Sequence, residues 1–116
     1  MIDQSWLQPK SPAEVEAILT QLRSRLEEVY GPRLRGLYLY GSYARGHAAP
    51  GSDLDVLLVL DRVDSYWSEI DRSGHVSSEL SLQHDLTISR AFVSEEQWQR
   101  AEIPLIRSVR REGKAA

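Results

Sequence analysis

The spacing of apolar residues predicts a long helix near the start of the chain. Apolar side chains recur three and four residues apart, and charged side chains occupy the opposite face. These apolar positions are Val15, Ile18, Leu19, Leu22, Leu26 and Val29. Ser11 to Glu14 form a capping box in which Pro12 suits the first helical position, and Gly31-Pro32 ends the pattern. A helix is therefore expected between Ser11 and Gly31.

Three further segments have the pattern of β-strands. Leu34 to Tyr40 is rich in apolar and aromatic residues and ends abruptly at Gly41-Ser42. After a loop from Gly46 to Ser52, the run from Asp55 to Leu60 (DVLLVL) is almost continuously apolar, which is typical of a central strand covered on both faces. From His84 to Val93 polar and apolar residues alternate, which predicts a third strand.

The remaining segments predict helices. Asp64 to Leu82 has a weaker helical pattern, which Gly74 is expected to break or bend. Ser94 begins a second capping signal for a short helix through Ala101, and Pro104 breaks or restarts it before a basic tail. These elements predict an α/β (α+β) fold with a mixed central sheet flanked by helices.

The composition is that of one ordinary globular domain covering residues 1–116. Its 41% hydrophobic and 27% charged residues suit neither a disordered chain nor a membrane protein. The net charge of −3 argues against extended nucleic-acid binding. The chain has no cysteine, which excludes a disulfide framework, a thiolate nucleophile and a cysteine-ligated metal. Without a signal-peptide pattern or a long apolar run, we expect a cytoplasmic protein with no membrane contact.

Two aspartates at the mouth of the buried strand are the first candidates for chemistry. An isolated pair such as Asp53-x-Asp55 is most often a turn or cap feature. Here, however, Asp55 would be carried toward the buried end of a strand, where an unpaired carboxylate costs several kcal/mol. Residues i and i+2 of a strand share a face about 6.6 Å apart, within joint reach of two Mg²⁺ ions about 3.5–4 Å apart. The pair is therefore a candidate metal site.

A third carboxylate would complete such a site from a neighbouring strand, about 4.8 Å away. Asp85 is the candidate, because it opens the alternating segment HDLTIS. The alternative is an acid at a strand end that faces water.

Gly41 and Ser42 supply a candidate anion site. A glycine lets backbone amides approach a phosphate, and the hydroxyl of Ser42 adds a donor. Alternatively, Ser42 caps a short helix that starts at Tyr43, which is compatible with anion binding. Arg45 either neutralises phosphate charge or pairs with a carboxylate such as Asp53.

Together these motifs resemble a known family. LYLYGSYARG from Leu37, followed by GSDLDVLLV from Gly51, is similar to the nucleotidyltransferase superfamily with the polymerase-beta-like fold, and in particular to its minimal nucleotidyltransferases (MNT). The resemblance extends over residues 13–113, with its motif core at 34–93. It implies Mg²⁺-dependent transfer of a nucleoside monophosphate from an NTP such as ATP to an acceptor hydroxyl, with release of pyrophosphate.

The resemblance also implies roles for single residues. Gly41 and Ser42 would hold the triphosphate, and Asp53 and Asp55 would bind both metal ions. Asp85 would complete the acceptor-side metal and help deprotonate the acceptor.

Family analogy implies a partner as well. Small MNT proteins are typically paired with a helical HEPN-type protein, and several pairs act as toxin and antitoxin, with the MNT protein adenylylating the toxin. Our leading hypothesis is such an antitoxin. The alternatives are an enzyme that modifies a small hydroxylated molecule, and a binding protein that neutralises its partner by occlusion.

Other conspicuous residues are given structural interpretations. Trp6, Trp67 and Trp98 are expected to be core or interface anchors rather than base-stacking platforms, because no basic groove accompanies them. The arginines of the C-terminal segment are expected to form a solvated helix face, with an acidic partner surface as the alternative.

Overall fold

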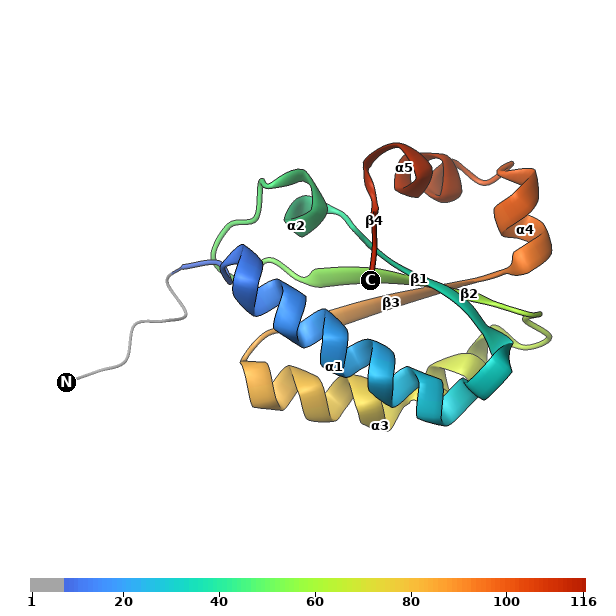
Figure 1. The fold of residues 1–116 in the computed structure, drawn as a ribbon, viewed down its shortest axis with the longest axis horizontal. Coiled ribbons are helices and arrows are strands. Elements are labelled where there is room, and N and C mark those ends of the chain that lie inside the picture. Colours follow the sequence, from blue (N-terminus) through green and yellow to red (C-terminus); the bar gives the residue numbers. More distant parts are fainter. Residues whose placement is uncertain (1–7) are drawn as a thin grey trace.

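A computed structural model describes residues 8–116 (Figure 1). The elements are α1 (Pro12–Tyr30), the 3-10 turn η2 (Gly31–Arg33), β1 (Leu34–Tyr40), α2 (Ser42–Arg45), β2 (Leu54–Leu60), α3 (Tyr66–His84), β3 (Ile88–Ser94), α4 (Glu95–Arg100), α5 (Pro104–Glu112) and β4 (Lys114–Ala115).

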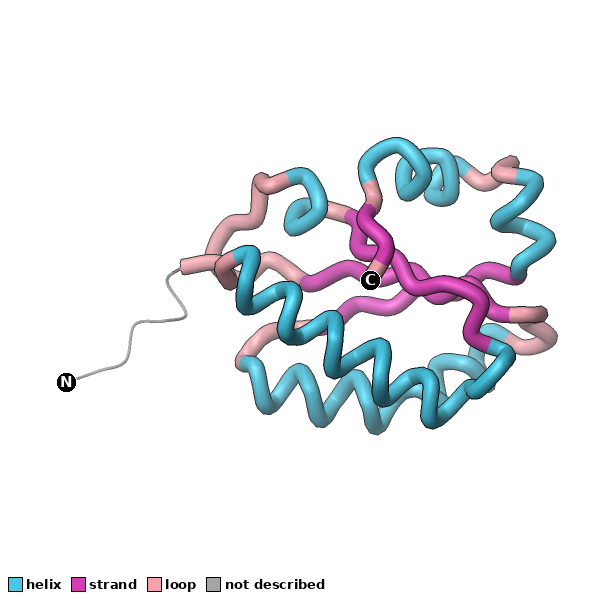
Figure 2. Tube along the Cα trace, in the orientation of Figure 1, coloured by secondary structure: helices cyan, strands magenta, loops and turns pink. Residues whose placement is uncertain are grey.

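The strands, magenta in Figure 2, form one mixed sheet. Their order in the sheet is β3-β2-β1-β4. β2 pairs antiparallel with β1 and parallel with β3, and β4 pairs antiparallel with β1. β2 is thus an interior strand, as its apolar run predicts. The predicted mixed sheet flanked by helices is confirmed.

Helices cover both faces of the sheet. α1 and α3 lie against one face, and α4 and α5 lie over the other (Figure 1). Successive residues of β2 therefore enter different cores: Leu58 packs with Leu22 of α1, and Leu57 packs with Ile106 of α5. Both strand residues have no exposed surface.

The predicted boundaries of α1 are confirmed. The Ser11 side chain accepts a hydrogen bond from the Glu14 amide, the Glu14 side chain accepts one from the Ser11 amide, and the helix ends before Gly31. The predicted restart at Pro104 is also confirmed, because α4 ends at Arg100 and α5 begins at Pro104.

The predicted break at Gly74 is wrong. α3 runs without interruption through this residue. A glycine costs a helix about 1 kcal/mol relative to alanine, and the buried face of α3 offsets that cost. That face consists of Glu69, Ser73, Val76, Ser77 and Leu80.

The predicted start of the third strand is also wrong. His84 is the last residue of α3, and β3 begins at Ile88. Between them Asp85 caps the helix in the left-handed region, with φ 53° and ψ 51°. Aspartate tolerates this conformation better than most residues, because its short polar side chain can hydrogen-bond locally.

The tryptophans differ in their surroundings. Trp98 packs in the second core, where its ring stacks on Tyr38 with centroids 4.5 Å apart. Trp67 is 77% exposed and is not a core residue, and Trp6 lies outside the described residues. Among residues 8–116, no helix has the length and apolar character needed to cross a membrane.

Candidate active site

Asp55 lies on the sheet face covered by α4 and α5. It is the second residue of β2, and it shares this face with Leu57 because side chains alternate along a strand. Its neighbours across the sheet are Tyr40 at the end of β1 and Ser89 in β3. Asp53 precedes the strand and is exposed.

The turn at Gly41 closes directly onto Asp55. Gly41 has φ 76° and ψ −157°, a conformation that only glycine adopts readily. A Cβ atom added to Gly41 would lie 2.2 Å from Oδ2 of Asp55. Both the backbone conformation and the close approach therefore require glycine, and the two predicted motifs come together in the folded chain.

The surroundings of the Asp55 carboxyl group disfavour its charged form. Partial burial raises its pKa, the charge of Asp53 raises it further, and the charge of Arg45 opposes both effects. Burial also raises the pKa of Tyr40, with a further contribution from the charge of Asp55. Within residues 8–116, neither Asp53 nor Asp55 has an ion-pair partner within 4.0 Å.

Ser42 does not have the capping role considered from the sequence. It is itself the first residue of α2, the N-cap is Gly41, and no side chain caps this end. The Gly41 carbonyl instead accepts hydrogen bonds from the amides of Ala44 and Arg45.

Arg45 pairs with a carboxylate that the sequence did not suggest. One guanidinium nitrogen lies 3.6 Å from Oε2 of Glu112, at the end of α5. From the sequence, Asp53 was one possible carboxylate partner of Arg45. That pair does not form among the described residues. Glu112 is far from the motifs in the chain, and the two-residue strand β4 that brings it here has no periodic pattern.

The structure does not bring the three predicted carboxylates together. Asp85 sits at the end of α3 rather than in β3, and the β3 residue opposite Asp55 is Ser89. Within the described chain, no three His, Cys, Asp or Glu side chains gather closely enough to hold one metal ion. Asp85 lines a separate pocket of about 490 Å³, together with Ser52 and Thr87.

The Asp53 and Asp55 pair fits Mg²⁺ without a third carboxylate. Mg²⁺ prefers oxygen ligands and is usually held in proteins by one or two carboxylates, with substrate phosphates and water completing its shell. The charge of Asp53 already disfavours ionisation of Asp55. A cation between the two carboxylates would reverse this effect.

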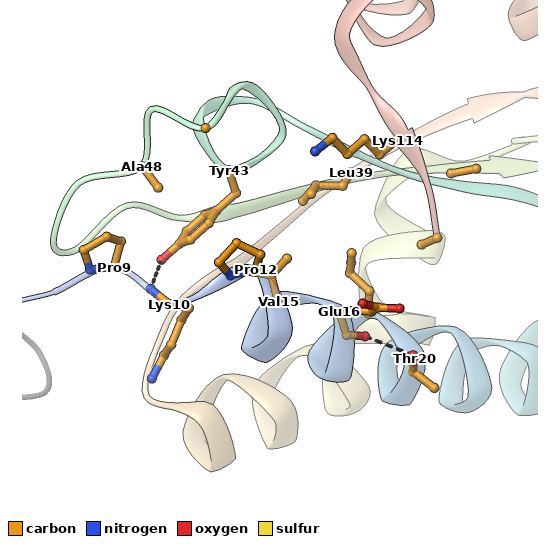
Figure 3. Close-up of a pocket in the computed structure, with 14 residues that line it drawn as sticks. Pro9, Lys10, Pro12, Val15, Glu16, Thr20, Leu39, Tyr43, Ala48 and Lys114 are labelled. Atoms are coloured by element: carbon orange, nitrogen blue, oxygen red, sulfur yellow. Dashed lines mark hydrogen bonds between the residues drawn. The ribbon is translucent and has the colours of Figure 1, made fainter.

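A pocket of about 580 Å³ lies elsewhere, between the start of α1, α2 and β4 (Figure 3). Its walls include Val15, Leu39 and Tyr43, and the Tyr43 hydroxyl accepts a 3.0 Å hydrogen bond from the Lys10 amide. Leu39 faces the α1 side of the sheet. This pocket is therefore on the opposite side of the sheet from Asp55.

Comparisons with known proteins identify the family to which these motifs belong. The sequence model of the nucleotidyltransferase domain matches residues 19–110. The protein adenylyltransferase MntA of Thermococcus cleftensis is 33% identical over 81 residues, which are 70% of this chain and 80% of that protein.

Two solved structures have the same fold. One is a toxin–antitoxin with AMP-PNP, with a TM-score of 0.53 and 23% identity over 81% of this chain and 68% of that chain. The other is a mutant of the toxin–antitoxin MntA–HpeT, with a TM-score of 0.54 and 20% identity over 87% of this chain and 69% of that chain. The family match covers most of the chain, so this protein belongs to the nucleotidyltransferase domain family and is a nucleotidyltransferase.

Proposed function

We propose that this nucleotidyltransferase moves AMP from ATP to a hydroxyl group on a partner protein, in a reaction that depends on Mg²⁺. The partner is a helical HEPN-type toxin, and the modification makes this protein its antitoxin. The observation that carries the proposal is the closure of the Gly41 turn onto Asp55, 2.2 Å from the position of an added Cβ, beside the second carboxylate of Asp53. The adenylyltransferase named MntA and the toxin–antitoxin with AMP-PNP support the choice of nucleotide and partner.

The proposed roles are those that the family resemblance implies, and the positions of the side chains support them. Asp53 and Asp55 would hold Mg²⁺, which supplies positive charge at the phosphates when bound. The turn at Gly41 and the hydroxyl of Ser42 would hold the triphosphate, and Arg45 would neutralise part of its charge.

The reaction is a substitution at the α-phosphorus. The acceptor oxygen forms a bond to that phosphorus, the bond to the oxygen bridging the α- and β-phosphates breaks, and pyrophosphate leaves as the hydroxyl proton is released. The protein contributes by positioning the groups in line and by stabilising charge. The Gly41 turn, which would hold the triphosphate, closes onto the carboxylate of Asp55, which would hold the metal, and this arrangement suits the task.

The test is to co-express the tagged protein with its genomic neighbour and to measure the intact masses of both chains. We expect a nucleotide-sized mass increase on the partner with the wild-type enzyme and none with Asp55→Asn. A complex that forms equally well without an adduct in either sample would contradict the proposal and favour occlusion. Transfer of AMP to a small hydroxylated compound, with no adduct on the partner, would show that the acceptor is not a protein.

A further inference from the structure

The outer side of α3 carries apolar side chains that face away from the rest of the chain. Among residues 8–116, the large apolar side chains that are exposed are Tyr66, Trp67 and Leu82, and all three belong to this helix. The Tyr66 hydroxyl accepts a hydrogen bond from the Phe92 amide, so Tyr66 has a role within the chain. Trp67 and Leu82 are 77% and 85% exposed. Most of their apolar surface therefore remains available to a partner.

Trp67 and Leu82 mark the two ends of one stripe along the helix. They are about four turns apart, so they lie on nearly the same side of α3. The positions between them on this side are Asp71, Gly74 and Ser78. Asp71 and Ser78 are exposed, and Gly74 is half-buried. These five residues form the α3 stripe, which has a large apolar side chain at each end and short side chains in its middle.

Gly74 has no explanation within the chain itself. A Cβ atom added to it would meet no atom within 4 Å, and its φ is not positive. Glycine weakens the interior of a helix relative to alanine. Neither the packing nor the backbone of this chain therefore requires glycine at this position. Close approach of another molecule to the middle of the α3 stripe would require it.

The α3 stripe is complementary to itself when a second copy lies antiparallel to it. Gly74 and His75 lie midway between Trp67 and Leu82 in the sequence. A two-fold axis at this midpoint brings Trp67 of each copy opposite Leu82 of the other, because both residues lie about 11 Å along the helix from the axis. The same apolar contact then forms twice, and the two helices come closest at Gly74.

The polar residues of this side of α3 are complementary under the same axis. Asp71 comes opposite Ser78 of the second copy, whose hydroxyl can donate to the carboxylate. Arg72 comes close to the level of Glu79 of the second copy, so opposite charges meet on the flank of the stripe. The side chains of Arg72 and Glu79 are 49% and 59% exposed. Both pairs form twice, so the charges favour a second copy of this chain.

We infer that the α3 stripe is the interface of a homodimer, in which α3 pairs antiparallel with α3 of a second copy and Trp67 and Leu82 are the anchors. α3 covers the sheet face opposite to that of Asp55 (Figure 1). Both candidate active sites therefore stay open in the dimer. The interface also gives one explanation for two features that the fold of the single chain leaves unused, the exposed Trp67 and the helical Gly74.

The experiment is sedimentation equilibrium of the purified full chain at micromolar to submillimolar concentrations, without nucleotide or partner. We expect a reversible equilibrium between monomer and dimer. Trp67→Ser and Leu82→Ser should each weaken dimerisation by at least about ten-fold, the loss typical of an anchor residue.

Gly74→Glu is the sharpest variant, because it separates association from folding. The long charged side chain should abolish dimerisation by blocking the approach of the second helix. The melting temperature of the monomer should stay the same or rise, since the added Cβ meets no atom of the chain and glutamate favours a helix. The matched control is Gln99→Glu, which adds the same charge at an exposed position of α4 and should dimerise like wild type.

Three results would overturn the inference. One is a wild-type protein that stays monomeric over the whole concentration range. Another is a dimer that persists in both Gly74→Glu and Trp67→Ser, because it would use a different surface. The third is a monomer in which Trp67 becomes protected only when the co-expressed partner protein is added, which would assign the α3 stripe to that partner. Sedimentation does not depend on transfer, so a protein without transferase activity would contradict the proposed function alone.

Discussion

Gly41 shows how single residues of the site constrain one another. Its positive φ and the contact with Asp55 both exclude a side chain. We predict that Gly41→Ala loses about 1–3 kcal/mol of stability through backbone strain alone, and that it also displaces the Asp55 carboxylate and abolishes transfer. Urea unfolding and the intact-mass assay measure the two effects.

Gly51 provides the matched control for this prediction. Its φ is 80°, but an added Cβ would have no atom within 4 Å. Gly51→Ala should therefore lose stability while keeping transfer activity. Equal loss of activity in both variants would show that the contact between Gly41 and Asp55 is not the cause.

Asp55 should make stability depend on pH. Its pKa is raised in the folded protein, so the unfolded chain releases this proton at lower pH. The carboxyl group is therefore neutral in both states well below its ordinary pKa of 3.8. It begins to destabilise the fold as the pH rises through that value, and the effect is complete above the folded pKa.

We predict that Asp55→Asn without metal is more stable than wild type at pH 7, by a fraction of a kcal/mol. The difference should disappear as the pH falls below the ordinary aspartate range. Urea unfolding in EDTA at several pH values measures it. A gain that is constant with pH would mean that the substitution acts through packing rather than charge.

At the scale of elements, α3 protects the open edge of the sheet. β3 is an edge strand, and such strands pair readily with other chains unless their backbone groups are covered. The Ile88 amide donates to the Ser81 hydroxyl and the Ile88 carbonyl accepts from the Ser77 hydroxyl, at 3.2 and 3.3 Å. The Phe92 amide donates to the hydroxyl of Tyr66, at 3.2 Å. An unbroken α3 is needed to place all three helix side chains along one strand.

We predict that Tyr66→Phe loses about 1 kcal/mol of stability, because it removes one hydrogen bond and leaves the Phe92 amide without its partner. The uncovered edge should also increase self-association. Urea unfolding and light scattering measure these effects, with Trp67→Phe as the control, since Trp67 is 77% exposed. Equal association in both variants would argue against a protective role for Tyr66.

The elements that the sequence predicts well are those determined by local signals. The capping box at Ser11 and the apolar run of β2 each identify an element without knowledge of its neighbours. Gly74 misleads because the buried face of α3 outweighs a local glycine penalty. Asp85 misleads because a left-handed cap interrupts an alternating segment, which has the same polar and apolar pattern as a strand.

In the candidate site too, local sequence signals predict some residues, and tertiary placement determines others. Gly41 and Asp55 are predicted because each belongs to a short motif beside a strand, and their contact follows from the pairing of β1 with β2. The positions of Glu112 and Ser89 depend on tertiary placement, since Glu112 is brought beside Arg45 through β4 and Ser89 is brought opposite Asp55 by the register of β3. Neither residue has a sequence signal of its own.

At the scale of the whole molecule, the site joins segments that are distant in the chain. The Gly41 turn directly follows β1, and Asp53 and Asp55 come after the loop that leads to β2. Glu112 lies at the end of the last helix, where it pairs with Arg45. A nucleotide bound to these groups would contact residues that come together only when β1 has paired with β2 and β4. Its binding energy therefore adds to the stability of the complete fold.

We predict that Mg²⁺ and ATP together raise the melting temperature more than the sum of their separate effects. At 100 times the Kd, binding adds about 2.7 kcal/mol of stability, which corresponds to a rise of about 10 °C for a domain of this size. Differential scanning calorimetry measures the shift, and Asp55→Asn should lose the joint effect while keeping its fold. An equal joint shift in that variant would mean that the nucleotide binds without the aspartate pair, because Asp55 is one of the two carboxylates that would link metal to phosphate.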